Sequence, residues 1–334
     1  YSWFTGHPLV YFWLLPAYVS WYGMLPRQAG GRLFSDSLAR LAFWMFLIVS
    51  VPVGFHHQFV DPGVPQTWKW IHAMLTYSVF FPSMITAFTV IASLEYAARK
   101  RGGTGLIGWV RALPWTDPSV AAQLLAGILF MFGGIGGLTN ASYNLNLVIH
   151  NTAWVPGHFH LTVASAVTLS FMGISYWLVP YLTGRKLHTP MLALVQGWTW
   201  FVGMIIFSNA MHVLGLLGAP RRTPLGEAPY IPEAWEGHLL RTSIGGAILL
   251  VSALIYGYVM VRTAFGKKLA EEEIPEVPIA QSIRSPQLTP LWLDRFKPWL
   301  IAAGLLLVIA YGPQLVDQIL NMNLNAPGAA DTPW

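Results

Sequence analysis

Eight long apolar stretches, separated by short polar connections, limit what this chain can fold into more than any other feature. A helix needs about 20 mostly apolar residues to cross the hydrocarbon core of a bilayer. Stretches of this kind occupy residues 7–26, 39–60, 70–98, 119–139, 158–181, 191–218, 238–262 and 298–320. We therefore expect an all-α integral membrane protein with about eight transmembrane helices, and residues 1–334 forming a single membrane domain.

The composition fits a protein surrounded by membrane lipid and excludes several other classes. Of 334 residues, 54% are hydrophobic and 10% are charged, against roughly 25% charged in a typical soluble domain. The absence of cysteine excludes disulfides, thiolate-ligated clusters and thiolate copper sites. Nucleic acid is not an expected partner, because the basic residues alternate with apolar stretches instead of gathering on one surface.

The basic residues also predict an orientation. Fifteen of the 19 Lys and Arg residues fall in one set of alternate connections, and four fall in the other set. Cytoplasmic connections carry such an excess of positive charge, so we expect both termini on the outer face. The stretch 263–297, which contains the acidic triplet Glu271 to Glu273, is predicted to be a solvated cytoplasmic linker between the last two helices.

Two adjacent histidines, His56 and His57, lie inside an apolar stretch, where such a pair is costly and therefore indicates a functional site. The predicted orientation places them in the outer third of the membrane, together with His7, His158 and His160. Neutral imidazole is the commonest protein ligand of transition metals, so this shared depth predicts a metal centre. The remaining histidines of the apolar regions and their ends are interpreted as interfacial or structural: His72, His188, His212 and His238.

The spacing of these histidines suggests how they bind. His7 and Tyr11 are four residues apart and share one face of a helix. Consecutive helical residues diverge by about 100°, but Pro52 and Gly54 can unwind the turn before His56 and let both adjacent rings converge. Three imidazoles from two helices predict a copper site with an open position for a small ligand.

His158 and His160 are two residues apart, so their side chains point about 200° apart around a helix. They cannot share one metal ion. Each can instead ligate a different cofactor, and haem iron commonly takes a single proximal histidine.

Two rows of hydroxyl side chains run inward from the histidines. Tyr18 and Tyr22 lie four residues apart on the first predicted helix, and Ser83, Thr86 and Thr89 follow at i, i+3 and i+6 on the third. Such hydroxyls can simply bond to their own helix backbone. They can also carry protons from the cytoplasmic side to the metal centre, and both interpretations stay open on the residues alone.

Three motifs closely resemble subunit I of the haem–copper oxidases, in particular the B-type branch of ba-type cytochrome c oxidases. They are GHPLVYFWLLPAY at 6–18, HHQF at 56–59 and NTAWVPGHFHL at 151–161. The similarity continues through LPRQAGGRL at 25–33, RGGTGLIGWVRALPW at 101–115 and PRR at 220–222.

The resemblance implies a role for each histidine of the motifs. His7, His56 and His57 would ligate the copper ion called Cu-B, and Tyr11 would be cross-linked to the ring of His7. His158 would be the proximal ligand of a high-spin, a-type haem. A low-spin, b-type haem would take His160 on the opposite face of the same helix. The hydroxyl rows resemble the single proton-uptake path of this branch.

The implied activity is that of a proton-translocating terminal oxidase in a prokaryotic inner membrane, which reduces O2 to water. The implied partners are a subunit II carrying a dinuclear copper site and an electron donor that is cytochrome c or a small copper protein. Residues of the outer connections would lie near the haem propionates: Asn146, His150, Asn151, Arg221 and Arg222.

Two departures from the family pattern stand out. The family carries Asp at the position of Asn146, and because Asn does not titrate, it cannot share the proton-loading role that a carboxylate would have at this position. The family also needs at least twelve transmembrane helices, including one with the second histidine of the low-spin haem. We therefore expect this chain to be the C-terminal part of subunit I and an N-terminal part to be its partner.

Three other interpretations remain open. A nitric oxide reductase of the same superfamily would hold non-haem iron beside glutamates and would lack Tyr11, so metal analysis separates it from an oxidase. A histidine-lined proton channel or transporter would bind no haem and show no Soret band. A purely structural membrane scaffold would leave the shared depth of five histidines without a reason.

Overall fold

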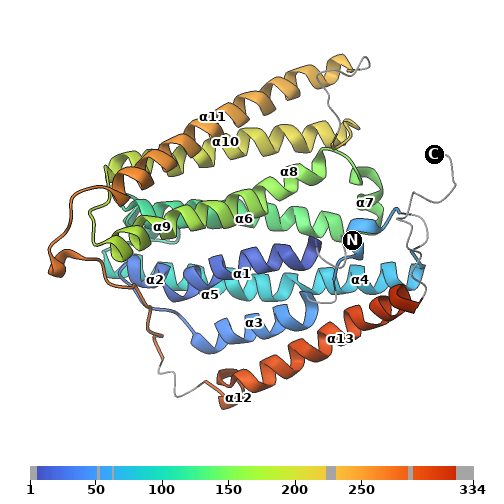
Figure 1. Ribbon diagram of the computed structural model, residues 1–334, viewed down its shortest axis with the longest axis horizontal. Helices are drawn as coiled ribbons and strands as arrows, with labels where there is room; N and C mark the ends of the chain where they lie inside the picture. The colour runs from blue at the N-terminus through green and yellow to red at the C-terminus, as the bar shows by residue number, and fades with distance from the viewer. Residues whose placement is uncertain (1–5, 51–52, 62–63, 223–230, 285–288, 321–334) are drawn as a thin grey trace.

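The computed structural model describes residues 6–50, 53–61, 64–222, 231–284 and 289–320. Within these residues the chain is helical, and its only β pairings are three isolated bridges. Most of the long helices lie side by side along one direction (Figure 1). The main helices are α1 (His7–Gly23), α2 (Leu25–Gln28), α3 (Asp36–Ser50), α4 (Gln66–Ser78), α5 (Phe80–Lys100), α6 (Pro118–Ala141), α7 (Tyr143–Ile149), α8 (Trp154–Leu161), α9 (Thr168–Thr183), α10 (Pro190–Leu216), α11 (Glu233–Ala264), α12 (Leu291–Asp294) and α13 (Phe296–Leu320).

The expected all-helical membrane fold is confirmed. Five stretches are long and apolar enough to cross a membrane: Gln66–Lys100, Pro118–Ala141, Trp154–Thr183, Pro190–Leu216 and Glu233–Ala264. The other three predicted stretches also contain helices. Helix α1 has 17 residues and α3 has 15, and α13 has 25, of which the described residues Phe296–Ile309 form an apolar segment.

The second predicted transmembrane stretch, 39–60, is not one helix. Helix α3 ends at Ser50, and the histidine pair lies beyond it in a short 3-10 turn, η2 (Phe55–Gln58). Pro52, which was expected to unwind this region, lies outside the described residues. The third stretch is also divided, into α4 and α5 on either side of Val79. Pro82 explains this break, because a proline has no N–H to donate and its ring crowds the carbonyl of Ser78 four residues earlier.

Glycines allow the central helices to pack closely. An added methyl group at Gly133 of α6 would lie 2.6 Å from Thr162 Cγ2, and one at Gly245 of α11 would lie 2.7 Å from the Phe207 nitrogen of α10. Small residues at such contacts let helix backbones approach within a membrane. At one edge of the bundle, α13 packs on α3, with the rings of Trp44 and Trp299 4.2 Å apart (Figure 1).

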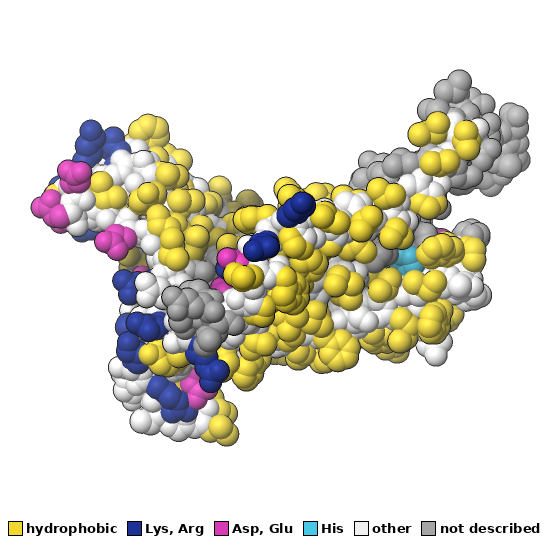
Figure 2. Space-filling model, turned by 90° about the horizontal axis from the view of Figure 1, so that it is seen from below, with side chains coloured by type: hydrophobic (Ala, Val, Ile, Leu, Met, Phe, Trp, Pro, Cys, Tyr) yellow, Lys and Arg dark blue, Asp and Glu magenta, His cyan; other side chains and the backbone are white. Residues whose placement is uncertain are grey.

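The connection between the last two predicted transmembrane helices is bound to the bundle. It contains η6 (Glu271–Glu273) and α12. Its backbone forms hydrogen bonds to the ends of α9 and α1. Leu269 N donates to Gly184 O over 2.8 Å, and Ala280 N donates to Gly23 O over 2.6 Å. Residues 265–284 therefore form a strap across one end of the bundle, and on the face shown in Figure 2 Lys and Arg side chains gather at that end.

Candidate metal centre

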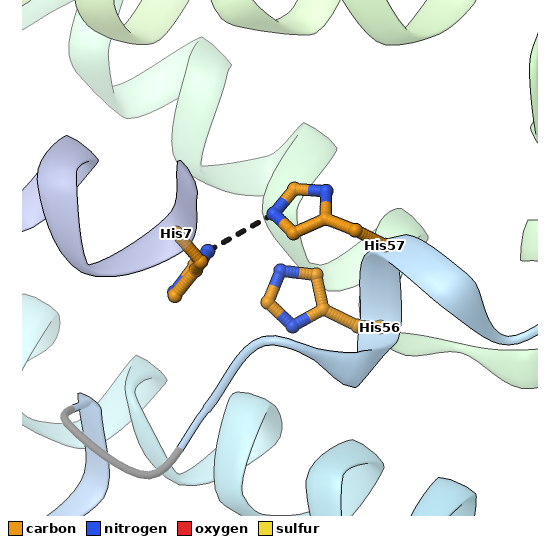
Figure 3. A group of neighbouring side chains, drawn as sticks. All are labelled: His7, His56 and His57. Carbon is orange, nitrogen blue, oxygen red and sulfur yellow. Dashed lines mark hydrogen bonds between the residues drawn. The ribbon is translucent and has the colours of Figure 1, made fainter. Parts of the chain in front are cut away.

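Three imidazoles from two separate segments converge on one point (Figure 3). His7 begins α1, and His56 and His57 lie in η2. Each ring offers one nitrogen, and the three nitrogens lie within 4.8 Å of one another. His7 Nδ1 is 3.0 Å from His57 Nε2, and the ring of His7 stands edge-on to that of His56 with centroids 4.4 Å apart.

Local backbone geometry explains why two consecutive histidines face the same point. In a straight α-helix their side chains would diverge by about 100°. In η2 the His57 N–H instead donates to Gly54 O over 3.1 Å, which closes a tighter turn. Asn146 of α7 holds this turn from the other side, because its Nδ2 donates to His56 O over 3.1 Å and to Asn140 O over 2.9 Å. The convergence expected from the sequence thus occurs, although outside a transmembrane helix.

Tyr11 packs against the His7 ring one turn further along α1. The two ring centroids are 4.8 Å apart at an interplanar angle of 74°. His7 Nε2, the ring nitrogen that does not face His57, is buried and has no hydrogen-bond partner. A buried polar nitrogen without a partner is unusual and indicates an interaction that the polypeptide fold alone does not supply.

A cavity of about 680 Å³ adjoins the three imidazoles and is lined by them, by Tyr11 and by His158 of α8. From α6, Gly127, Gly134 and Gly137 line this cavity, and a methyl group added at the adjacent Gly136 would lie 2.6 Å from His158 Nδ1. Phe159 stacks on His57 with ring centroids 6.0 Å apart and an interplanar angle of 14°. The wall of the cavity thus carries one histidine of α8 in addition to the three of the cluster, and its volume can hold a large cofactor.

His160 points away from this cavity. It is absent from the cavity lining, and its ring packs against Phe207 of α10 with centroids 4.6 Å apart. Its Nδ1 lies 2.6 Å from Pro156 O, which orients the ring. The chain then continues through one π-helical turn, η4 (Thr162–Val167), where Ser165 Oγ donates to His160 O. The expected division of His158 and His160 between two sides of the helix agrees with this arrangement.

The polar residues expected near the haem propionates form a second cluster around Asp61, which was not predicted as a site residue. His150 Nε2 lies 3.1 Å from Asp61 Oδ1, an aspartate four residues after His57. Asn151 O accepts from Arg221 N over 2.9 Å, which brings the arginine pair beside this histidine. Burial lowers the pKa of the Arg221 guanidinium, the neighbouring Arg222 lowers it further, and Asp61 opposes both. Asp61 could have been suspected from its position, since few acids lie so close to an apolar stretch.

The hydroxyl rows meet inside the bundle. Tyr22 of α1 donates to Thr86 Oγ1 of α5 over 2.7 Å, and Thr86 in turn donates to Pro82 O. Ser83 donates to Val79 O, one turn earlier in the chain. This is the local backbone bond that such hydroxyls can form in place of a role in proton transfer. The hydroxyls of Tyr18 and Thr89 are buried without a partner. Such orphaned hydroxyls are typical positions for bound water in a protein interior.

Two side chains of α4 next to η2 were also missed. His72, expected to be interfacial or structural at a loop end, is 2% exposed and accepts a hydrogen bond from Gly54 N. Thr76, one turn later, has its hydroxyl 3.0 Å from His56 Nδ1. Neither residue stands out in the sequence, because only the fold brings α4 against the histidine pair.

Comparison with known proteins gives consistent matches over most of the chain. Residues 1–248 match the family described as cytochrome C and quinol oxidase polypeptide I. The chain is 49% identical to cytochrome c oxidase subunit 1 of Thermus thermophilus over 330 residues, which are 96% of this chain and 58% of that protein. It is 30% identical to cytochrome c oxidase polypeptide 1 of Halobacterium salinarum over 76% of this chain and 39% of the relative.

A solved structure is also similar to this chain in fold and sequence. A haem–copper terminal oxidase dimer, solved by cryo-EM, superposes with a TM-score of 0.87 and 42% sequence identity. The match covers 94% of this chain and 56% of that one. The match therefore covers little more than half the length of the Thermus relative and of this oxidase.

Proposed function

Because this chain belongs to the cytochrome c and quinol oxidase polypeptide I family, we propose that it forms the catalytic core of a haem–copper terminal oxidase that reduces O2 to water. The observation that carries the proposal is the meeting of three imidazole nitrogens, within 4.8 Å of one another, at a cavity that His158 faces from another helix. When bound, haem and copper would supply the oxygen-binding site and pass electrons to O2.

The residues present fit a copper ion. The nearest nitrogens are His7 Nδ1 and His57 Nε2, which face each other over 3.0 Å. With copper bound between them these two nitrogens and His56 would be its ligands, because borderline metals such as copper favour neutral imidazole. No carboxylate belongs to this cluster among the described residues, so its donor set suits copper better than a harder ion.

The same cavity fits the high-spin haem, with His158 as the proximal ligand. Gly127 and Gly134 of α6 line the cavity and have open space where a side chain would begin, which leaves room for the haem. The inner part of the cavity is apolar and lined by Leu94, Trp109 and Leu113. This lining suits a haem with a long alkyl substituent, which supports the proposal of an a-type haem.

His160 would ligate a low-spin haem, proposed to be b-type, on the opposite side of α8. Since the chain spans 58% of its Thermus relative, we propose that a further part of subunit I supplies the second axial histidine. A subunit II with a dinuclear copper site, receiving electrons from cytochrome c or a small copper protein, is the proposed source of electrons. The inner membrane of a prokaryote is the proposed location, with the metal centre in its outer third and both termini outside.

Tyr11 and the hydroxyl rows are proposed to handle protons. Tyr11 lies against His7 at the cavity and would deliver a proton and an electron there, cross-linked to the orphaned His7 Nε2. Protons would reach it from the cytoplasmic side through Thr89, Thr86, Tyr22, Ser83 and Tyr18. The partnerless hydroxyls of Tyr18 and Thr89 support this path, because bound water there would complete it.

Outer groups would hold the haem propionates and receive pumped protons. Arg221 and Arg222 suit propionate binding, with Asn151 fixing the backbone of the first. His150 with Asp61 provides a hydrogen-bonded pair of an imidazole and a carboxylate on this side, whereas Asn146 serves as an amide clamp on η2. Net pumping is therefore proposed to depend on the His150–Asp61 pair and not on position 146.

The proposed function is tested by purifying the assembled complex from its host membrane and measuring its haem spectrum and oxygen consumption. We expect Soret bands from two haems and oxygen uptake with reduced donor. A complex without a Soret band would contradict haem binding. Non-haem iron in place of copper, with reduction of nitric oxide but not of oxygen, would contradict the oxidase assignment.

A further inference from the structure

Helix α4 approaches the metal centre with two polar side chains one turn apart, His72 and Thr76. His72 is 2% exposed, and Thr76 lines the cavity. Neither belongs to the three-imidazole cluster. Both nevertheless contact the segment that carries His56. His72 bonds to the backbone of Gly54, and Thr76 contacts the ring of His56.

The hydroxyl of Thr76 determines which nitrogen of His56 can bind a metal. A threonine hydroxyl has one proton to donate. Thr76 Oγ1 donates that proton to His72 O over 2.6 Å, so toward His56 Nδ1, 3.0 Å away, it can only accept. His56 Nδ1 must then carry the ring proton, which leaves the lone pair on Nε2.

His72 fixes the backbone from which His56 projects. Its Nδ1 accepts from Gly54 N over 3.2 Å, just before η2 begins. The same residue provides, through its carbonyl, the acceptor that orients the Thr76 hydroxyl. The His72 side chain thus fixes the backbone position of His56. The His72 carbonyl orients the Thr76 hydroxyl, which in turn fixes the tautomer of the His56 ring.

We propose that His72 and Thr76 act as positioning residues, an α4 brace, that present His56 Nε2 to copper. This inference rests on the proposed function, since it assumes a copper ion among the three imidazoles. Groups that hydrogen-bond to the remote nitrogen of a ligating histidine set its tautomer and ring orientation, and their loss typically weakens metal binding about 10- to 100-fold. The structure assigns this role to a threonine hydroxyl and not to the more usual carboxylate or backbone carbonyl.

The test compares paired variants of the assembled oxidase. Thr76→Val removes the hydroxyl while keeping the shape, whereas Thr76→Ser keeps the hydroxyl. His72→Leu removes the acceptor, whereas His72→Asn places an amide oxygen near the position of Nδ1. Copper retention is measured as the chelator concentration that removes half of the copper from the histidine site, and copper geometry as the infrared stretch of CO moved onto copper by photolysis.

We expect Thr76→Val and His72→Leu to lose copper at about ten-fold lower chelator concentration and to shift the CO band. Thr76→Ser and His72→Asn should match the parent. Ser78→Ala is the matched control on the same helix, because the Ser78 hydroxyl donates to Met74 O and not toward the metal centre. It should change neither readout.

Three results would overturn either the proposed function or the α4 brace. A parent oxidase without copper at this site would overturn the proposed function. A parent with copper, and variants Thr76→Val and His72→Leu that retain it equally with an unshifted band, would overturn the brace alone. If Thr76→Val does not assemble, Thr76→Ser still tests the proposal. Because this variant keeps the hydroxyl, its loss of copper would overturn the brace.

Discussion

The hydroxyl of Tyr22 donates to Thr86 Oγ1 over 2.7 Å and joins α1 to α5 inside the bundle. Both side chains are 4% exposed, so the bond lies away from bulk solvent. It connects two hydroxyl rows that the sequence places on separate helices, and it lies between the charged end of the bundle and the imidazole cluster.

Replacing Thr86 with valine tests whether this link carries protons. Thr86→Val keeps the shape and removes the acceptor of the Tyr22 bond. If the broken link raises the barrier to proton transfer by about 1.4 kcal/mol, the rate falls roughly ten-fold, so we expect turnover to fall by about that factor with unchanged haem spectra. Thr199→Val, at an exposed threonine that bonds to its own helix, is the control. Unchanged turnover would remove Thr86 from the path.

Replacing Tyr11 with phenylalanine tests its role at the cavity. Tyr11→Phe keeps the ring against His7 but removes the phenolic proton. We expect copper and haem contents to stay at the parent level while oxygen reduction falls by about 100-fold or more, the range for losing a proton donor. Steady-state oxygen uptake at matched copper content measures this. Tyr256→Phe on α11, where the hydroxyl contacts Ser175, should leave turnover unaffected.

Replacing Asn146 with aspartate tests the amide clamp on η2. The amide donates to His56 O and Asn140 O, and an ionised carboxylate has no proton for either carbonyl. We expect Asn146→Asp to destabilise the region by about 1–3 kcal/mol, because two buried carbonyls lose their donor. Thermal loss of copper is the measurement. A variant as stable as the parent would show that the clamp tolerates a carboxylic acid.

Enlarging Gly136 tests the wall behind His158. In Gly136→Ala the new methyl group would lie 2.6 Å from His158 Nδ1, so the ring must move. Overpacking of this kind costs about 1–3 kcal/mol, and we expect the high-spin haem content to fall. Reduced-minus-oxidised and CO-difference spectra measure it. Gly257→Ala on α11, with open space around the added carbon, is the matched control and should retain both haems.

Much of the site could be predicted because local spacing determines it. The four-residue step from His7 to Tyr11 and the two-residue step from His158 to His160 each translate directly into helix geometry. The apolar stretches likewise predicted an all-helical membrane fold, although they extended α3 past Ser50, where the helix ends. Hydrophobicity alone does not reveal that the histidine pair lies in a turn.

What could not be predicted depends on contacts between distant segments. Asp61 meets His150 across 89 positions, and Thr76 meets His56 only because α4 folds back against η2. The stretch 263–297, which contains the strap, was predicted to be a solvated linker from its charge and prolines. Its attachment is through backbone groups, such as Ala280 N to Gly23 O, which no side-chain pattern encodes.

The central claim is that His7, His56 and His57 together hold one copper ion. The most direct test is copper analysis of the assembled oxidase beside a His7→Ala variant, with copper-edge X-ray absorption on both. We predict that the variant lacks one copper ion of the parent's total, with the loss of a site ligated by imidazole nitrogen. Equal copper in the two proteins, with unchanged absorption spectra, would contradict the account.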